Sequence, residues 1–505
     1  MSGSSEPSKP STESPLNELK GPVLRRSLAI VTIAWMFGSV WMTTTAGAPI
    51  TQFARALGAS EFQFGLLTAL PFIASLLSMP ASMLIEATGQ RKKIFLWSLM
   101  FQRLLWIPIA LVPWAMVHWF GRESAPHAMA ALLILIFLMH SGQAFGGPAW
   151  VSWMADVVPD RRRGKYFARR RQWGMLSAIP AALVVGWLLD HYVRGEDLET
   201  TMRWCAAIFI VACICGSIDI LMFIAVPDVP KRPQGGKELL HSLISPLRNR
   251  QFLWFCAYVA VMVFAVSFMG QFVTLYMIER VRLDNMGVQI MLLVVPMTTQ
   301  LALMSVWGRA ADRMGKKPLL MLAGVGVTVP AFLWVFVTPE LWWIGIVASI
   351  LGAAFWTGIE IANFNLVIEM SDSQRADGQP QVGGSAFMAV NAIVINVAGC
   401  LGGLSSGMIA KYLKDWSWVP FEGFKAITYF EVLFIVSGVL RLASVVIFLP
   451  FVHEPQARPT VEALRFMTSN IYNNLHNAIL QPLRFVGMVD DEEVEKKQTS
   501  PMKRD

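Results

Sequence analysis

The sequence predicts an all-α integral membrane protein with about twelve transmembrane helices in two groups of six. Of its 505 residues, 55% are hydrophobic and only 15% are charged, and the mean hydropathy is +0.50. A soluble chain would carry about a quarter charged residues. Runs of about 20 or more mostly apolar residues, long enough to cross a bilayer as helices, recur along the chain. A polar break divides these runs into two groups of six.

The apolar runs define two predicted helical halves, residues 25–227 and 252–452. Each run reads as one span because it has the length and composition of a membrane helix. The expected spans are about 27–48, 62–85, 94–118, 127–154, 173–190 and 203–227 in the first half, and about 252–278, 287–307, 318–338, 341–368, 385–410 and 424–451 in the second.

Three polar segments lie outside these halves. Residues 1–24 are rich in Ser, Pro, Glu and Lys, so we expect a disordered tail; the apolar run that follows is a full span rather than a removable signal peptide. Residues 228–251 read as a Pro/Gly-rich cytoplasmic linker. In the tail at 453–505, apolar residues recur with helical spacing at 461–483, which predicts an amphipathic helix on the membrane surface.

Basic residues set the expected orientation. Placing both termini in the cytoplasm assigns most of the 42 Lys and Arg residues to inner loops, as the positive-inside rule requires. The richest inner loop begins at Asp160-Arg161-Arg162-Arg163 and continues through Arg169–Arg171. We expect these arginines to set topology and contact lipid headgroups rather than to bind a ligand. The pattern predicts a protein of the cell (inner or plasma) membrane.

A short loop motif occurs twice between apolar runs. Residues 308–317 read Gly-Arg-Ala-Ala-Asp-Arg-Met-Gly-Lys-Lys, and residues 82–93 carry a degenerate copy with Ser82, Glu86 and Ala87 in place of Gly, Asp and Arg. In both, a carboxylate ends a helix, Gly follows three residues later, and a basic pair precedes the next helix. Gly permits a tight turn, and the carboxylate can dock at a neighbouring helix start.

A second repeat joins the two halves. Asp156 and Arg162 at the end of the fourth run have the same separation as Glu369 and Arg375 at the end of the tenth. With the loop motif, this pattern resembles the signature of the major facilitator superfamily over residues 25–452. The resemblance implies two pseudo-symmetric six-helix bundles that move a small solute by alternating access.

The resemblance also implies a cytoplasmic gate at the repeated loop. The stretch 148–156 resembles a variant seen in bacterial members of the family. We expect Asp312 to dock at a helix start in the opposite half and Arg313 to hold it there. The simpler interpretation is a basic loop that caps membrane helices. The gate residues implied are Glu86, Gly89, Arg91, Gly308, Asp312, Arg313, Gly315 and Lys316.

In this family the first, fourth, seventh and tenth helices line a central cavity, which implies a set of polar candidates. Glu360 is the sharpest, because it lies near the middle of its span and shares a helix face with Asn363. A carboxyl with few water contacts has its charged form disfavoured, so it could hold and release a coupling proton. The alternative is an ion pair with a basic residue on another helix. The candidates are Thr44, His140, Gln143, Gln271, Glu360 and Asn363.

Four further charged residues lie on helices that support the bundle from outside in this family. Arg103 and Asp219 could form a buried pair in the first half. In the second half, Arg441 could pair with Glu431 or Glu369. The favoured interpretation is structural, because an intramembrane charge needs a partner.

Other features exclude competing classes. Five cysteines lie within apolar runs at no metal-binding spacing, and no phosphate-binding Gly-x-x-x-x-Gly-Lys-Ser/Thr loop is present. The net charge of +8 reflects loop topology rather than a nucleic-acid surface. Gly399, Gly403 and Gly407 give one helix a smooth face for close packing or sliding. We expect no catalytic residue, cofactor or metal.

The sequence therefore predicts a secondary active transporter, working by symport or antiport, with proton coupling as one option. Its expected partners are a small-molecule substrate and membrane lipids, and we expect a monomer. The alternative is a non-transporting member of the fold, either a sensor or a helper that delivers a lipid or hydrophobic cofactor, because Trp-rich helices suit an aromatic-lined cavity.

Overall fold

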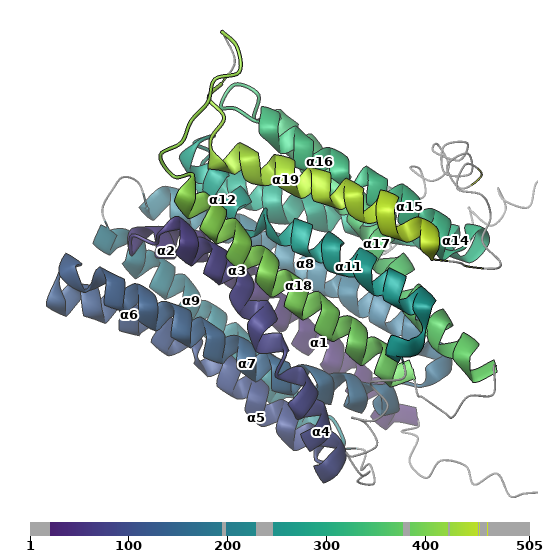
Figure 1. Ribbon diagram of the computed structural model, residues 1–505. Coiled ribbons are helices and arrows are strands. Elements are labelled where there is room, and N and C mark those ends of the chain that lie inside the picture. Colours follow the sequence, from purple (N-terminus) through teal and green to yellow (C-terminus); the bar gives the residue numbers. More distant parts are fainter. Residues whose placement is uncertain are drawn as a thin grey trace, which may run out of the picture.

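The computed structural model confirms the predicted helical membrane architecture (Figure 1). Twelve spans in the described residues are long and apolar enough to cross a membrane. The only β pairing within the described part of the chain is an isolated bridge between Trp418 and Ile427. The structure describes residues 21–193, 198–228, 246–376, 384–422 and 425–452, together with 454 and 462.

Several spans consist of two helices that meet at a break. The first half contains α1 (Gly21–Thr45) and α2 (Ala48–Ala56), α3 (Glu61–Ser75) and α4 (Ser78–Thr88), α5 (Arg91–Leu104) and α6 (Trp106–Phe120), then α7 (Ala125–Val157), α8 (Asp160–Tyr192) and α9 (Leu198–Met222). The second half contains α11 (Arg250–Ser267) and α12 (Gly270–Glu279), α13 (Asn285–Gln289) and α14 (Val295–Met314), α15 (Lys316–Gly326) and α16 (Thr328–Leu333), then α17 (Trp343–Ala376), α18 (Gly384–Tyr412) and α19 (Tyr429–Ala443).

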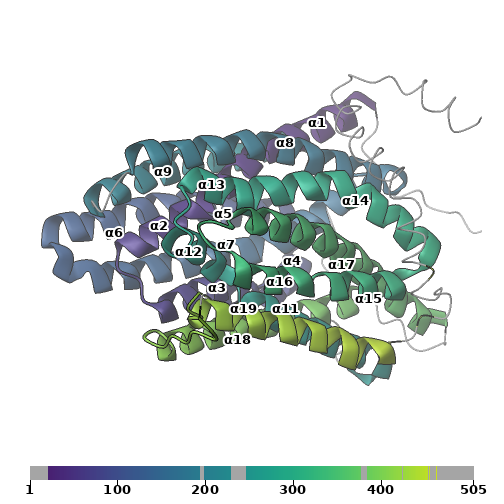
Figure 2. The same ribbon diagram turned by 90° about the horizontal axis from the view of Figure 1, so that it is seen from above.

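The two halves share a hydrophobic core at one end and have separate cores at the other. The shared core joins residues of both halves, such as Phe53 and Phe434. A second core around Phe95 lies within the first half, and a third around Phe387 lies within the second half. We call the end that holds the shared core the joined end, and the opposite end, with the two separate cores, the parted end. Figure 2 shows α2, α12 and α13 gathered at the joined end.

Close backbone packing holds the joined end. Helix α3 packs along α18, whereas α4, the next segment of the same span, packs mainly on α7 of its own half. A Cβ at Gly65 would overlap the backbone of Gly403 and Gly407, so the two helices meet at a contact that only glycine fits. On the other side of the molecule, α8 packs on α13. The glycine face that the sequence predicts therefore lies between the halves.

Helix boundaries differ from the sequence prediction at two places. Helix α1 begins at Gly21, so residues 21–24 are helical rather than part of a disordered tail. Helix α8 begins at Asp160, so the predicted Arg-rich inner loop is an extension of the fifth span. Arg and Lys are good helix formers, so a helix can continue beyond its apolar part. Residues 1–20, residues 229–245 of the predicted linker and nearly all of the predicted C-terminal helix lie outside the described residues.

Candidate functional site

A cavity of about 640 Å³ lies in the first half and reaches α12 of the second. Its wall draws on all six spans of the first half, including the third and sixth, which the sequence analysis placed outside the pathway. The break between α1 and α2 forms part of the wall, where Gly47 adopts a φ of 72°. Most of the lining is apolar. Its polar members are Thr45, Gln102, Arg103, His140, Gln143, Arg170, Asp219 and Gln271.

One buried ion pair lies in this wall. Arg103 Nη2 donates to Asp219 Oδ2 at 3.0 Å, and both residues are only 4% exposed. The guanidinium carbon of Arg103 also lies 3.5 Å from the centre of the Trp41 ring, and its Nη1 donates to Gln102. Close pairing and hydrogen bonds of this kind offset the cost of burying two charges. The structure thus brings Arg103 and Asp219 together, in the cavity wall rather than at the outside of the bundle.

Arg170 is the second cation of the cavity, and sequence reasoning treated it as a topology charge. Its guanidinium carbon lies 4.3 Å from the centre of the Trp35 ring and 4.7 Å from that of Trp150. Its Nε donates to the carbonyl oxygen of Val31 at 3.4 Å. Within the described part of the chain, no carboxylate forms an ion pair with Arg170. The side chain reaches this position because α8 extends through the Arg-rich segment.

Glu360 lies at the parted end, between the halves, and does not line the cavity. Its Oε2 is 3.6 Å from Arg171 Nη2, and the two side chains are 43% and 42% exposed. Its Oε1 accepts a hydrogen bond from Trp356 Nε1 at 3.0 Å. The expectation of a carboxyl with few water contacts is therefore wrong in this conformation. Arg171 also donates to Gln300 of the second half and so bridges the two halves, whereas its expected contact with lipid headgroups stays a prediction.

The other predicted cavity residues divide into two groups. His140, Gln143 and Gln271 lie in the wall. Thr44 does not, because its hydroxyl donates back to carbonyl oxygens of its own helix; the neighbouring Thr45 takes the place in the wall. Asn363 is half-buried on α17, away from the cavity, and its Oδ1 has no hydrogen-bond partner among the described residues.

Polar contacts across the joined end were not foreseen from the sequence. The carboxylate of Asp190, near the end of α8, accepts hydrogen bonds from the backbone N–H groups of Asn285 at 2.6 Å and Met286 at 2.8 Å. These groups belong to the start of α13 in the opposite half. Gln52 also donates to Asn285 at 2.7 Å. The sequence signal was an acidic residue ending an apolar run, but one sequence does not reveal which helix start it meets.

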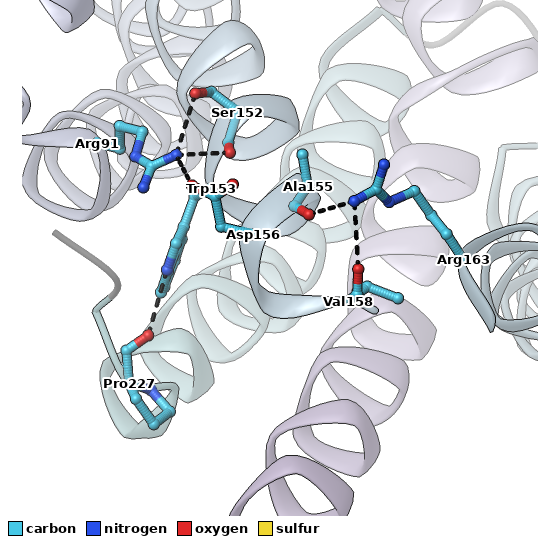
Figure 3. A network of polar contacts seen from close by, with 8 residues as sticks. All are labelled: Arg91, Ser152, Trp153, Ala155, Asp156, Val158, Arg163 and Pro227. Atoms are coloured by element: carbon cyan, nitrogen blue, oxygen red, sulfur yellow. Dashed lines mark hydrogen bonds and ion pairs between the residues drawn. The ribbon is translucent and has the colours of Figure 1, made fainter. Parts of the chain in front are cut away.

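In the repeated loop, Gly89 and Gly315 adopt left-handed φ values of 65° and 91°, as the turn requires. Arg91 donates to Asp156 at 2.5 Å and to Ser152 (Figure 3). In the second copy, Lys316 pairs with Glu369 at 2.9 Å. The first basic residue of each copy thus binds the carboxylate ending the fourth or tenth span, the two positions that the sequence repeat identified.

The second basic residue of each copy binds the end of a different span. Lys92 donates to the carbonyl oxygens of Ile224 and Val226, and Lys317 donates to that of Pro450. Cations favour helix C-termini, where carbonyl groups lack partners. Glu454 completes the second copy, because its carboxylate accepts from the backbone N–H groups that begin α15. These contacts of the basic pairs all stay within one half.

The acidic members of the loop have different surroundings. Asp312 and Arg313 are exposed and Glu86 is half-buried. Gly308 has open space around it, since a Cβ there would meet nothing within 4 Å. No hydrogen bond within the described residues joins Asp312 to a helix start of the first half, so the expected docked gate is absent from this conformation.

The expected pairing of Arg441 is wrong. Glu431 pairs instead with Lys425 at 3.0 Å and caps its own helix at Thr428. Arg441 is buried and donates to the carbonyl oxygen of Val327 and to the sulfur of Met269. Both residues lie at helix breaks, and at Val327 the break frees a carbonyl oxygen that a continuous helix would satisfy internally. The long side chain of Arg441 therefore binds neutral acceptors, and a search of the sequence for carboxylate partners does not reveal them.

Two six-helix halves, joined at one end around a cavity beside broken helices, define the class of alternating-access membrane proteins. The chain belongs to the Major Facilitator Superfamily, whose model matches residues 30–403. No match is found among curated protein sequences.

Solved transporter structures share this fold. A mutant of the nucleoside transporter NupG has 14% identity and a TM-score of 0.61, covering 85% of this chain and 100% of its own. The xylose transporter XylE from E. coli, in an inward-open conformation, has 14% identity and a TM-score of 0.61, covering 88% and 99%. A bacterial homologue of the iron transporter ferroportin, in an inward-facing state, has 15% identity and a TM-score of 0.59, covering 85% and 100%.

Proposed function

We propose that the protein is a secondary active transporter that moves a small solute by alternating access. The observation that carries this proposal is the asymmetry between the joined end and the parted end around one cavity. The parted end carries both copies of the repeated loop, residues 82–93 and 308–317, and the Arg-rich start of α8. The positive-inside rule therefore makes it the cytoplasmic end, with both termini inside and the protein in the cell membrane. Likeness to structures described as inward-open supports an inward-open assignment.

The geometry supplies the parts of a transport cycle. To open outward, the halves must break the bonds of Asp190 and Gln52 to the start of α13. To close the cytoplasmic side, the two copies of the repeated loop must approach each other at the parted end. The break between α1 and α2 and that between α11 and α12 lie beside the cavity and the joined end. Broken helices at such positions are common at transporter binding sites, where they allow local rearrangement.

Proton coupling is the mode that we propose, with Glu360 as the coupling group. Its pairing with Arg171 spans the two halves, so the charge of Glu360 affects how the parted end is arranged. A protonated Glu360 would release Arg171, whereas an ionised one attracts it. Closure of the parted end would remove water from Glu360 and disfavour its charged form. The carboxyl can thus change its charge between the two states, as coupling requires.

The test is uptake into proteoliposomes with and without a pH gradient. A thermal-shift screen of sugars, carboxylates, amines and lipids first identifies a stabilising solute. We expect Glu360→Gln to abolish gradient-driven accumulation while solute exchange continues. Glu123→Gln, at an exposed position of the joined end, should leave both intact.

Two results would contradict the coupling role. Accumulation by Glu360→Gln in response to a pH gradient would remove Glu360 from coupling. Loss of both accumulation and exchange in folded protein would place it in the substrate site instead. If lipids alone stabilise the protein and no solute crosses the membrane, the alternative function of lipid or cofactor delivery is favoured, since the cavity is lined largely by aromatic and aliphatic groups.

A further inference from the structure

We propose that the cavity binds an organic anion with an apolar body, and that Arg170 binds its acidic group. This inference rests on the proposed transport function and names the substrate class of the same site. It starts from a difference between two arginines that share one cavity wall. Arg103 is neutralised by Asp219 at 3.0 Å, whereas no described carboxylate pairs with Arg170.

The charge balance of the wall is therefore positive. Asp219 is the only carboxylate among the lining residues; it forms an ion pair with Arg103 and also attracts Arg170 electrostatically without pairing with it. Two arginines therefore share one carboxylate, which leaves a net positive charge in a mostly apolar pocket. A charge in such surroundings interacts strongly with an opposite charge, because water screens it poorly. A cationic ligand would find no free counter-charge in this wall and would face Arg170, whereas an anion would supply the missing partner.

The placement of Arg170 leaves its acid-binding groups available. The indole rings of Trp35 and Trp150 flank the guanidinium at 4.3 and 4.7 Å, and Nε is occupied by the carbonyl oxygen of Val31. The hydrogen bonds that the structure gives Arg170 use neither terminal nitrogen. A guanidinium held between aromatic faces keeps its planar fork pre-organised, which favours binding two acid oxygens at once.

The rest of the wall indicates an apolar body on the ligand. Phe95, Leu99, Ile136 and Met139 line the cavity with the tryptophans. A volume of about 640 Å³ is in the usual range for a site that encloses a drug-sized molecule. A polyhydroxylated sugar would need many polar partners here, and the lining offers few. An aromatic or aliphatic acid matches both the charge and the surface.

Binding of matched probes to the purified full-length protein in lipid nanodiscs, measured by isothermal titration, tests the inference. The probes are phenylacetate, phenylphosphonate, phenylacetamide, phenethylamine and acetate. We expect the amide and the amine to bind at least about tenfold more weakly than the better of the two aromatic anions, because a charge-assisted hydrogen bond is lost. Acetate should bind weakly because it lacks the apolar body. The ratio between carboxylate and phosphonate distinguishes the two kinds of acid group.

Substitutions assign the effect to Arg170. Arg170→Gln should weaken binding of the aromatic anion about tenfold or more and leave phenylacetamide unaffected. Arg170→Lys keeps the charge but loses the planar fork, so its affinity for the aromatic anion should lie between those of Arg170→Gln and wild type. Arg309→Gln removes a positive charge from an exposed position at the same end of the molecule and should change nothing. If Arg170→Gln does not fold, the preference for acid over amide in Arg170→Lys and wild type still tests the proposal.

The outcomes separate this inference from transport itself. Equal binding of acid and amide, preferential binding of the amine, or anion binding insensitive to Arg170→Gln would overturn the anion site. Transport of a neutral or cationic solute independent of Arg170 would also overturn it while supporting the proposed function. Binding of the aromatic anion through Arg170 without any transport in proteoliposomes would support the site and contradict the transport function.

Discussion

The joined end and the parted end hold the two halves by different kinds of contact. At the joined end, backbone meets backbone at Gly65 and Gly407, and the carboxylate of Asp190 binds main-chain N–H groups of the opposite half. At the parted end, the long side chain of Arg171 crosses between the halves and reaches Glu360 and Gln300. Close, directional contacts stabilise one end, whereas exposed charges bridge the other weakly. The difference indicates that the present conformation is set mainly by the joined end.

Overpacking the glycine contact should have the largest effect. In Gly65→Leu, the side chain would overlap the backbone of Gly403 and Gly407, which cannot move like a side chain. Overpacking of this kind costs about 1–3 kcal/mol or more, so we expect a lower thermal midpoint and separation of the halves. Thermal unfolding and spin-label distances across the joined end measure this. Gly164→Leu, where a Cβ meets nothing within 4 Å, is the matched control, and equal behaviour of the two variants would contradict the role of the contact.

Asp190→Asn should have the next largest effect. The substitution removes the charge that two backbone N–H groups of α13 share, and a hydrogen bond to a charged group contributes about 1.5–3 kcal/mol. We expect the population of conformations open at the joined end to rise, seen as longer spin-label distances there. Glu123→Gln, an exposed carboxylate at the same end, should leave the distances unchanged. An unchanged distribution in Asp190→Asn would show that the glycine contact alone closes this end.

Asp312→Asn tests whether the parted end has a latch of its own. Asp312 is exposed here, so its loss should not weaken the present conformation. If its carboxylate docks at a helix start after closure, about 0.3–1 kcal/mol of dipole interaction is lost, and the ensemble shifts further toward opening at the parted end. Cysteine accessibility at the inner loops measures the shift. Accessibility equal to that of wild type would argue against the latch.

Arg171→Gln should have the smallest effect on stability. Its pairing with Glu360 joins two side chains that are more than 40% exposed, and such pairs contribute about 0.2–1 kcal/mol. We expect a thermal midpoint close to that of wild type, with a small difference that disappears at high salt because the pair is screened. A large, salt-independent loss of stability would mean that the parted end is held more firmly than its exposed charges suggest.

The sequence predicted the features that depend on local periodicity and repetition. Span number, the glycine turn at Gly315 and the pair of Arg103 with Asp219 all correspond to the structure. The length of each apolar run, and the few charged residues within the runs that could pair with one another, can be read from one chain. These predictions therefore needed no tertiary information. The carboxylates of Asp156 and Glu369 were found as a repeat, although their basic partners in the loops were not assigned.

The errors arose where the partner was not a charge or not local. Arg441 binds a carbonyl oxygen and a sulfur, which no count of carboxylates can reveal. Asp190 binds backbone groups about 95 residues later in the chain, and backbone acceptors or donors leave no sequence signature. Arg170 was assigned to a loop because apolar content ends before it, yet α8 continues in its polar part. Because the helix was expected to begin with the apolar run, Arg170, which we now propose to bind the substrate, was placed in a loop.

The glycine contact between α3 and α18 also bears on the speed of rearrangement. Gly65, Gly403 and Gly407 have no rotatable side-chain bonds, so forming or breaking their contact orders and frees no rotamers. A contact between long side chains would change conformational entropy by up to about 1.5–2 kcal/mol for each residue immobilised. Two smooth backbone surfaces can roll against each other through a series of closely similar arrangements. The contact between α3 and α18 holds the halves together and can also rearrange with a low energy barrier while the halves rotate relative to each other.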